Sequence, residues 1–458
     1  MIKLEDYDYP SKYPKPFDHQ KVTVEFLLRN KRAFNLSGMG SGKTLCMLWV
    51  CDFLLKNQKI SKVLIVSPLS CVEGVWAETI EEHLPYLKYS VLTGTKANRL
   101  KELKSKANIF LINFDGVAVI FDELMKFKFD IIILDEASAY KNHQAIRSKQ
   151  MAKLAKPCKA VYALTATPLS ENPLPAFSYC KIVNPDSPYL PKGRGGFGKF
   201  KSLVMEEVRQ WVWEPREGHE KIVAAMLSPS IRYLTEDCVD MPEVVYQDRI
   251  IDMSPEAKET YDQFKKHMLV EYELGQITSA NAAVKIGKLL QITAGGVKDD
   301  DGNVLEIDCK NKVDEVVALF EENGKRPVII SAVYKATVAA LLKALKKYKV
   351  AKIDGSTKNR GDVIKAFTEF KLDFLILQPQ AASHGLNLQV CNLMVHMSPI
   401  MSNELNSQLE SRIIRPGQKN NMLIVNLISS PTERRFYNAL KNKKVIEEVM
   451  MNEFKHKE

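Results

Sequence analysis

The sequence predicts an α/β fold with two doubly wound parallel-sheet domains that carry helical insertions. A chain of 458 residues is too long for one ordinary hydrophobic core. In its first third, short β-branched runs alternate with helical stretches, and the same alternation returns near the C-terminus. Such alternation is typical of parallel sheets that are covered by helices on both faces.

Five apolar runs predict the strands of the first domain: 33–36, 62–67, 108–112, 130–135 and 160–164. Amphipathic segments such as LCMLWVCDFLLKN lie between them and predict the covering helices. We expect the first lobe to occupy 1–180. A basic and partly helical insertion with a linker is expected over 181–240.

A second set of apolar runs predicts the sheet of the second domain: 327–331, 350–353, 373–378, 392–397 and 422–429. We assign this lobe to 241–458. The segment 243–254 alternates like a strand and is expected to begin the lobe. Long helical patterns predict a helical insertion over about 255–308.

The composition, 45% hydrophobic and 26% charged, is that of a folded soluble protein. No apolar run reaches the ~18–20 residues that a membrane helix needs, and the polar N-terminus does not resemble a signal peptide. We therefore expect a cytoplasmic protein without a membrane partner. The eight cysteines form no CxxC pair, so we expect reduced thiols and no metal site built on them. The net charge of +10 favours a polyanionic partner such as nucleic acid.

A glycine-rich loop between an expected strand and an expected helix is the strongest local signal. Its residues are Ser37, Gly38, Met39, Gly40, Ser41, Gly42, Lys43 and Thr44. Glycines let backbone N–H groups surround phosphates at a helix N-terminus, where a lysine reaches the β- and γ-phosphates and a threonine hydroxyl binds Mg²⁺. The loop therefore predicts a site for ATP and Mg²⁺.

An acidic pair, Asp135 and Glu136, directly follows the expected strand 130–135. Taken alone, such a pair at a strand end is more often a helix N-cap than a catalytic group. With a phosphate loop upstream, the pair instead predicts that Asp135 binds the metal and Glu136 activates the attacking water.

A third signal is the segment QLESRIIRPGQ over 408–418. Arg412 and Arg415 are three residues apart, so on a helix they would share one face and could point at the same phosphate. The alternative is a basic helix face that is merely solvated.

These segments together resemble the motor of superfamily 2 helicases, and specifically its SNF2-like branch. The loop GMGSGKT resembles motif I, DEASAYKN motif II, LTATPLSEN motif III and QLESRIIRPGQ motif VI. SPLSCVEGVW resembles motif Ia, IDGST the LDGST element, AASHGLNL motif V, and PFDHQ the segment with the adenine-reading glutamine. The resemblance spans nearly the whole chain in the family's order and implies two RecA-like lobes.

The resemblance also implies roles for single residues of the nucleotide site. Gln20 would read adenine with Phe17 as a stacking partner, and Gly38, Gly40, Ser41 and Gly42 would hold phosphates with Lys43. Thr44 and Asp135 would bind the metal, and Glu136 would be the catalytic base. Arg412 and Arg415 would act as arginine fingers with Gln408 beside them.

Three further residues would couple ATP to nucleic acid: Thr165, Thr167 and Gly385. The chain departs from the family pattern at Ser138, Ala166, Ser411 and Pro416. None of these departures removes a charged catalytic group, so we expect hydrolysis to be kept while the coupling can differ.

The implied function is that of an ATP-dependent DNA helicase or translocase that hydrolyses ATP between its lobes and acts on duplex or branched DNA. The compact chain resembles a phage or bacterial enzyme, which predicts a monomeric motor in the nucleoid or host cytoplasm. Two alternatives stay open: an ATP-dependent RNA helicase, and a scaffold that binds DNA without catalysis.

The stretch 191–201 contains four cations, four glycines and two aromatic residues. One hypothesis is a mobile loop whose Lys192, Arg194, Lys199 and Lys201 reach DNA phosphates while Phe197 or Phe200 stacks on a base. The other is a flexible surface linker that its charges keep soluble.

Overall fold

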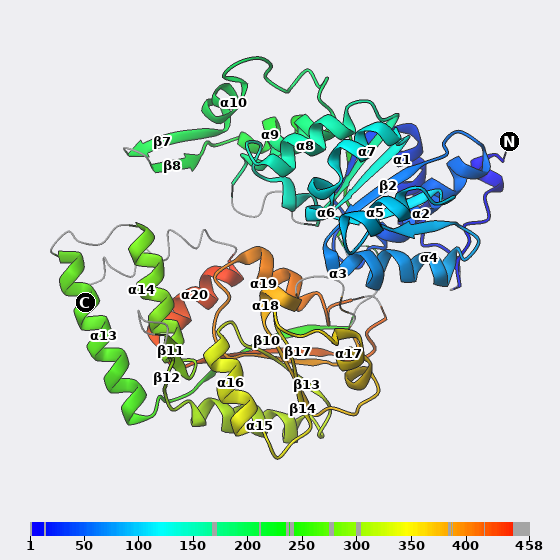
Figure 1. Ribbon diagram of the computed structural model, residues 1–458. Helices are drawn as coiled ribbons and strands as arrows, with labels where there is room; N and C mark the ends of the chain where they lie inside the picture. Colours follow the sequence, from blue (N-terminus) through cyan, green and yellow to red (C-terminus); the bar gives the residue numbers. More distant parts are fainter. Residues whose placement is uncertain are drawn as a thin grey trace. The chain divides into compact units, whose positions relative to one another are not determined.

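The computed structural model describes residues 2–12, 15–166, 172–209, 212–234, 238, 242–273, 279–298, 304–382, 386, 388–415 and 417–442. The chain forms two compact units, Met1–Asp240 and Met241–Glu458 (Figure 1). Each unit is built on one parallel sheet of six or seven strands with helices around it. The predicted α/β fold with two parallel-sheet domains is confirmed.

The sheet of the first unit has the strand order β3-β4-β2-β5-β6-β1-β9, and every neighbouring pair is parallel. Its strands are β1 (Arg32–Asn35), β2 (Val63–Ser67), β3 (Tyr89–Val91), β4 (Ile109–Asn113), β5 (Ile131–Asp135), β6 (Ala160–Leu164) and β9 (Ser230–Ile231). The five predicted strands are all present. The prediction missed β3 and β9 because two or three residues are too few to show a period.

Alternating side chains along the strands of this sheet enter two different cores. Ile131 and Ile133 of β5 pack with the helices on one face, and Ile132 and Leu134 pack on the other. The first face is covered by α1 (Asp18–Arg29), α2 (Lys43–Lys56), α3 (Leu69–Cys71), a π-helix (Val72–Ala77) and α4 (Glu78–His83). The second is covered by α5 (Lys96–Leu103), α6 (Phe114–Val119), α7 (Phe121–Phe127), α8 (Ile146–Ala155) and α9 (Pro175–Val183).

The basic stretch 191–201 is neither a free loop nor a linker throughout. Its second half forms helix α10 (Gly196–Val204), which leads into the hairpin β7 (Met205–Arg209) and β8 (Val212–Pro215) and helix α11 (His219–Met226). Figure 1 shows this hairpin beyond α10, away from the sheet. Phe200 is fully buried and Phe197 stacks on His143 with ring centroids 4.0 Å apart, so neither ring is presented to a base. The helix forms here because these apolar rings join the core.

The sheet of the second unit has the order β10-β17-β16-β13-β15-β14, again with every neighbouring pair parallel. Its strands are β10 (Val244–Ile250), β13 (Val328–Ser331), β14 (Val350–Ile353), β15 (Phe374–Leu377), β16 (Leu393–His396) and β17 (Met422–Ile428). Helices α15 (Lys310–Glu322) and α16 (Lys335–Ala344) pack on one face. Helices α17 (Arg360–Thr368) and α19 (Asn403–Glu410) pack on the other. The short helix α18 (Pro379–Ala382) follows β15.

The predicted helical insertion is formed by α13 (Pro255–Glu273), α14 (Ser279–Ile292) and the hairpin of β11 (Gly296–Lys298) and β12 (Val304–Glu306). Its apolar side packs against α20 (Pro431–Lys441). Glu433 of α20 also forms a buried ion pair with α15, in which Lys312 Nζ lies 2.7 Å from Glu433 Oε1. Thr293 of the insertion donates a hydrogen bond to the same oxygen at 2.8 Å. Among the described residues, no helix is both long and apolar enough to span a bilayer.

Candidate active site

The phosphate loop predicted at 37–44 connects β1 to α2 in the first unit. Gly40 and Gly42 have φ values of 79° and 81°, a conformation that side-chain-bearing residues rarely adopt. A Cβ atom on Gly42 would also lie 2.2 Å from Gln20 Nε2. Lys43 Nζ donates hydrogen bonds of 2.8 Å to the carbonyls of Ser37 and Gly38. The loop thus holds its lysine over its own backbone, where phosphate oxygens would replace the carbonyls.

The loop is braced from within and from a distant segment. Ser41 Oγ donates to the carbonyl of Gly38 at 2.9 Å. The N–H of Gly38 donates to the carbonyl of Tyr233 at 2.8 Å, and the N–H of Tyr233 donates to Ser37 Oγ at 3.2 Å. Tyr233 follows β9, so the short strand that the sequence did not reveal fastens this segment to the phosphate loop.

Gln20 lies beside the loop, and its reading of adenine stays a prediction. The backbone N–H of Phe17 donates to Gln20 Oε1 at 3.1 Å, and Gln20 Nε2 lies 3.5 Å from the carbonyl of Ser41. Sequence reasoning missed His19, whose Nε2 lies 3.1 Å from the same carbonyl and whose ring stacks on Phe17 at 5.7 Å. The half-exposed ring of Phe17 therefore has its orientation set by His19.

Asp135 stands at the end of β5, and its carboxylate accepts a hydrogen bond from a buried indole. Trp76 Nε1 donates to Asp135 Oδ2 at 2.8 Å. Burial raises the pKa of Asp135, while the hydrogen bond from Trp76 and the positive charge of Lys43 act to lower it. The positive charge of Lys43 thus acts on Asp135, and the binding of phosphate by one and of metal by the other stays a prediction.

Glu136 is held by two hydroxyl groups. Ser138 Oγ and Thr165 Oγ1 both donate to Glu136 Oε1, at 2.9 and 3.2 Å. Glu136 has a φ of 55°, a left-handed conformation that is uncommon for residues other than glycine and that costs energy. Ser138, one of the departures from the family pattern, thus takes part in orienting the predicted base. Thr165 does the same from the end of β6, which gives its predicted coupling role a physical route.

Gln408, Arg412 and Arg415 of the second unit lie close together, but the two arginines are not on a helix. Helix α19 ends at Glu410, and tight turns follow, in which Ile413 is buried in the core. In these turns the span of the backbone hydrogen bonds is mixed, with the N–H of Arg412 donating to the carbonyl of Leu409 and that of Ile414 to the carbonyl of Glu410, so the regular helix does not continue. The expectation of one shared helix face, which rests on amino-acid spacing alone, is therefore wrong.

Both arginines are directed at the same backbone carbonyl. Arg412 Nη1 and Arg415 Nη1 donate to the carbonyl of Leu386 at 3.4 and 3.1 Å. Arg412 Nε also donates to the carbonyl of Gln408 at 3.1 Å. Gln408 Oε1 is buried and accepts no hydrogen bond in the part of the chain that the structure describes. Two of the predicted coupling residues, Thr167 and Gly385, lie outside the described residues.

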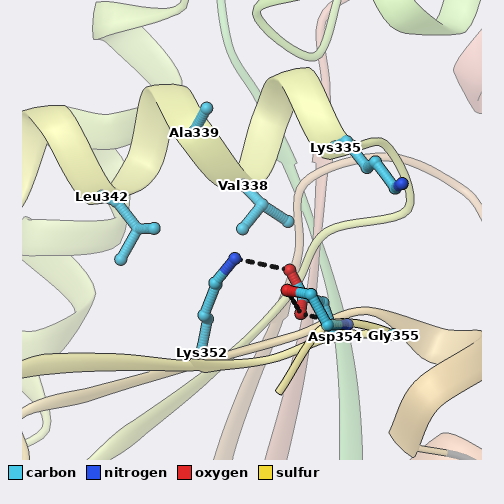
Figure 2. Close-up of a pocket in the computed structure, with 8 residues that line it drawn as sticks. Lys335, Val338, Ala339, Leu342, Lys352, Asp354 and Gly355 are labelled. Atoms are coloured by element: carbon cyan, nitrogen blue, oxygen red, sulfur yellow. Dashed lines mark hydrogen bonds and ion pairs between the residues drawn. The ribbon is translucent and has the colours of Figure 1, made fainter. Parts of the chain in front are cut away.

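The loop with the sequence IDGST follows β14 and lines a cavity of about 530 Å³ beneath α16. Figure 2 shows Lys352 directed at Asp354, and the two side chains are 2.6 Å apart. The hydrogen bonds from Lys352 and Ser356 lower the pKa of Asp354 well below its ordinary value. Arg360 donates to the carbonyls of Asp354 and Ala381 and so ties this loop to the motif V segment. The negative charge of Asp354 in this cavity is thus paired with Lys352 of β14.

Known families and proteins match this chain over most of its length. Residues 19–294 match the SNF2-related domain, and residues 311–417 match the helicase conserved C-terminal domain. A putative protein of Acyrthosiphon pisum secondary endosymbiont phage 1 is 26% identical over 97% of this chain and 99% of its own length. An uncharacterized ATP-dependent helicase of Mycoplasma genitalium is 24% identical over 86% of this chain. A SWI/SNF-related regulator of chromatin, subfamily A-like protein 1 homolog, of Caenorhabditis elegans is 23% identical over 92% of it.

The chain spans nearly all of the phage protein, but 38% of the mycoplasma helicase and 60% of the nematode protein. The SNF2-related match covers more than half of the chain and includes the phosphate loop, the acidic pair and the segment at Tyr233. The helicase C-terminal match includes the IDGST loop and both arginines. The chain therefore belongs to the SNF2-related family of ATP-dependent helicases and translocases.

Proposed function

We propose that this chain hydrolyses MgATP at the phosphate loop of its first unit and uses the energy to move along duplex or branched DNA. The observation that carries the proposal is the arrangement of Glu136. Its carboxylate is held by two hydroxyls, and its neighbour Asp135 lies within the electrostatic reach of Lys43. A phosphate-binding lysine, a metal-binding carboxylate and an oriented base are the parts that hydrolysis of a bound nucleotide requires.

The residues of the first unit suit MgATP by their chemistry. Backbone N–H groups of the loop and Lys43 would bind the phosphates once these replace the carbonyls of Ser37 and Gly38. The Thr44 hydroxyl and the Asp135 carboxylate are oxygen ligands of the kind that Mg²⁺ prefers, and the ion would neutralise phosphate charge. Glu136 would take a proton from the attacking water.

Arg412 and Arg415 would stabilise the charge of the transition state when the two units close around ATP. Such arginines raise rates by ~10³–10⁵ in related nucleotide hydrolases. Their joint contact with the Leu386 carbonyl supports this role, because the two guanidinium groups already converge on one oxygen atom. DNA that binds both units would favour closure, so the track would stimulate hydrolysis.

Two observations support DNA as the polymer along which the chain moves. The net charge of +10 favours a polyphosphate partner, and the nematode relative is a regulator of chromatin by name.

We further propose that the chain acts as a cytoplasmic monomer, as its sequence predicts.

Steady-state ATP hydrolysis by the full chain tests the proposal when it is measured without nucleic acid and with duplex DNA, single-stranded DNA and RNA. We expect the largest stimulation with duplex or branched DNA. Stimulation by RNA alone would replace the DNA motor with an RNA helicase. Tight DNA binding without any ATP hydrolysis would replace it with a non-catalytic scaffold.

A further inference from the structure

The indole of Trp76 reaches the proposed metal ligand because of the strand order in the first unit. Strands β2 and β5 are neighbours, with Val66 paired to Leu134. Since both strands are parallel, the chain leaves them at the same edge of the sheet. The segment after β2 contains the π-helix Val72–Ala77, of which Trp76 is a part, and β5 ends in Asp135.

The π-helix gives this segment an unusual backbone at the edge where the nucleotide site lies. Such helices are rare, and they occur frequently at functional sites. Trp76 is fully buried and belongs to the same hydrophobic core as Ile65 of β2 and Ile133 of β5. Only the indole N–H extends from this apolar contact to a polar partner, which is Asp135 Oδ2 at 2.8 Å.

Trp76 is the side chain that hydrogen-bonds Asp135 in the described structure. Lys43 acts on Asp135 through its charge, while its ammonium group donates to the carbonyls of Ser37 and Gly38. An indole can donate a hydrogen bond but cannot accept one. A packed indole that donates to one carboxylate oxygen therefore fixes the rotation of the carboxylate and stays in place when the phosphates draw Lys43 away.

We propose that Trp76 is a positioning residue that orients the carboxylate of Asp135 for the metal ion of MgATP. The inference rests on the proposed function, because it requires Asp135 to bind the metal. Hydrogen-bond partners that orient a metal ligand typically contribute 10–100-fold to metal affinity or activity. The contribution is expected in metal binding and not in the binding of metal-free ATP.

A conservative substitution with a matched control tests this role in the full chain. Trp76→Phe keeps an apolar ring and removes the N–H group. Trp49→Phe removes an equally buried indole of the same unit, whose N–H donates to the Pro10 carbonyl at 2.8 Å. The two readouts are the affinity of the ATP complex for Mn²⁺, measured by electron paramagnetic resonance, and the affinity for ATP in EDTA, measured by calorimetry.

We expect Trp76→Phe to weaken Mn²⁺ binding by about tenfold or more, with ATP affinity in EDTA changed less than twofold. Trp49→Phe should leave both quantities unchanged. If Trp76→Phe does not fold, replacement of Trp76 by 3-benzothienylalanine removes the N–H with little change in shape. The proposal would be overturned if the folded Trp76 variant bound Mn²⁺ as tightly as the wild type. It would also be overturned if that variant lost affinity for metal-free ATP to the same extent as for Mn²⁺.

A double-mutant cycle shows whether Trp76 acts through Asp135. In the Asp135→Asn background, we expect Trp76→Phe to cause no further loss of Mn²⁺ affinity. If Trp76→Phe weakens Mn²⁺ binding as much in the Asp135→Asn background as in the wild type, Trp76 does not act through Asp135 and the inference is wrong. The proposed hydrolysis of ATP is not affected by that result. If Asp135→Asn itself did not weaken Mn²⁺ binding, the metal assignment of the proposed function would fail instead.

Discussion

The cations of the two units are held in different ways. Lys43 donates to carbonyls of its own loop, six and five residues before it in the sequence. Arg412 and Arg415 donate to Leu386, which belongs to a separate segment of the second unit. The first unit also places two carboxylates, Asp135 and Glu136, near its cation. The predicted catalytic groups of the first unit thus include a base and a metal ligand as well as the lysine, whereas those of the second unit are the arginines alone.

The largest effects should come from the first unit. Glu136→Gln should slow hydrolysis by about 10²–10⁴-fold because the amide cannot take the proton of water. Its oxygen can still accept hydrogen bonds from Ser138 and Thr165, so ATP should stay bound. Lys43→Ala should abolish hydrolysis and also weaken ATP binding. If either variant hydrolysed ATP at the wild-type rate in the presence of DNA, the first unit would not contain the groups that hydrolysis depends on.

Substitution of the arginines should have a smaller effect. Arg412→Ala and Arg415→Ala should each reduce DNA-stimulated hydrolysis at least tenfold, which corresponds to ~1.4 kcal/mol of transition-state stabilisation. ATP affinity should change much less, since the phosphate loop is untouched. Single-turnover hydrolysis and equilibrium ATP binding separate these effects. If both variants hydrolyse ATP like the wild type, the two arginines serve only to hold the Leu386 carbonyl.

The hydroxyl groups around Glu136 offer a finer test of the first unit. Ser138→Ala removes one of two hydrogen bonds to Glu136 Oε1 and leaves that of Thr165. We expect a loss of about 1 kcal/mol, or about fivefold in the hydrolysis rate. In the Glu136→Gln background the same change should cost less, because the base it orients is already absent. An equal effect in both backgrounds would mean that Ser138 acts elsewhere.

The sequence predicted those parts of the fold that depend on long apolar runs. The five strands at 33–36 to 160–164 are almost entirely buried on both faces, and such strands show as nearly continuous apolar runs. Strand β9 pairs with β1 over only two residues. This pairing brings Tyr233 to the phosphate loop, where its carbonyl accepts a hydrogen bond from the N–H of Gly38. Tertiary contact decides that element, so no local pattern could reveal it.

The site was predictable where a motif carries the chemistry and unpredictable where packing orients it. Lys43, Asp135 and Glu136 belong to such motifs. The donor to Asp135 is Trp76, 59 residues earlier in the sequence, and only the neighbouring positions of β2 and β5 bring the two together. The spacing of Arg412 and Arg415 suggests a helix, but regular helical hydrogen bonding stops after Glu410, and the spacing alone does not reveal that end.

The sequence offers Phe197 as a ring that stacks on DNA, and the structure changes that expectation. The ring contacts both His143, which follows motif II, and Phe177 of α9. Phe197→Ala should therefore destabilise the first unit by about 3 kcal/mol or less, since the ring is only partly buried. Thermal unfolding measures this loss. A variant of unchanged stability with impaired processing of branched DNA would restore the stacking role.

The smallest effect is expected from the cations of 191–201, whose substitution should change DNA affinity and not hydrolysis. This stretch is a third basic region beside Lys43 of the first unit and the arginines of the second. Lys192, Arg194 and Lys199 are exposed, whereas Lys201 Nζ lies 3.4 Å from the ring centre of Trp213. Because this cation–π contact already engages Lys201, we expect the three exposed cations to contact DNA phosphates and Lys201 to contribute little.

Changing Lys192, Arg194 and Lys199 to Ala should make the plot of log DNA affinity against log salt concentration less steep. The slope should fall by up to about 0.9 for each duplex phosphate that the variant no longer neutralises. Hydrolysis without DNA should stay at the wild-type level, and Lys201→Ala is the matched control of equal chemistry. An unchanged salt slope in the triple variant would make this segment a surface helix without a role in DNA binding, and would leave DNA contact to the regions around the two sites.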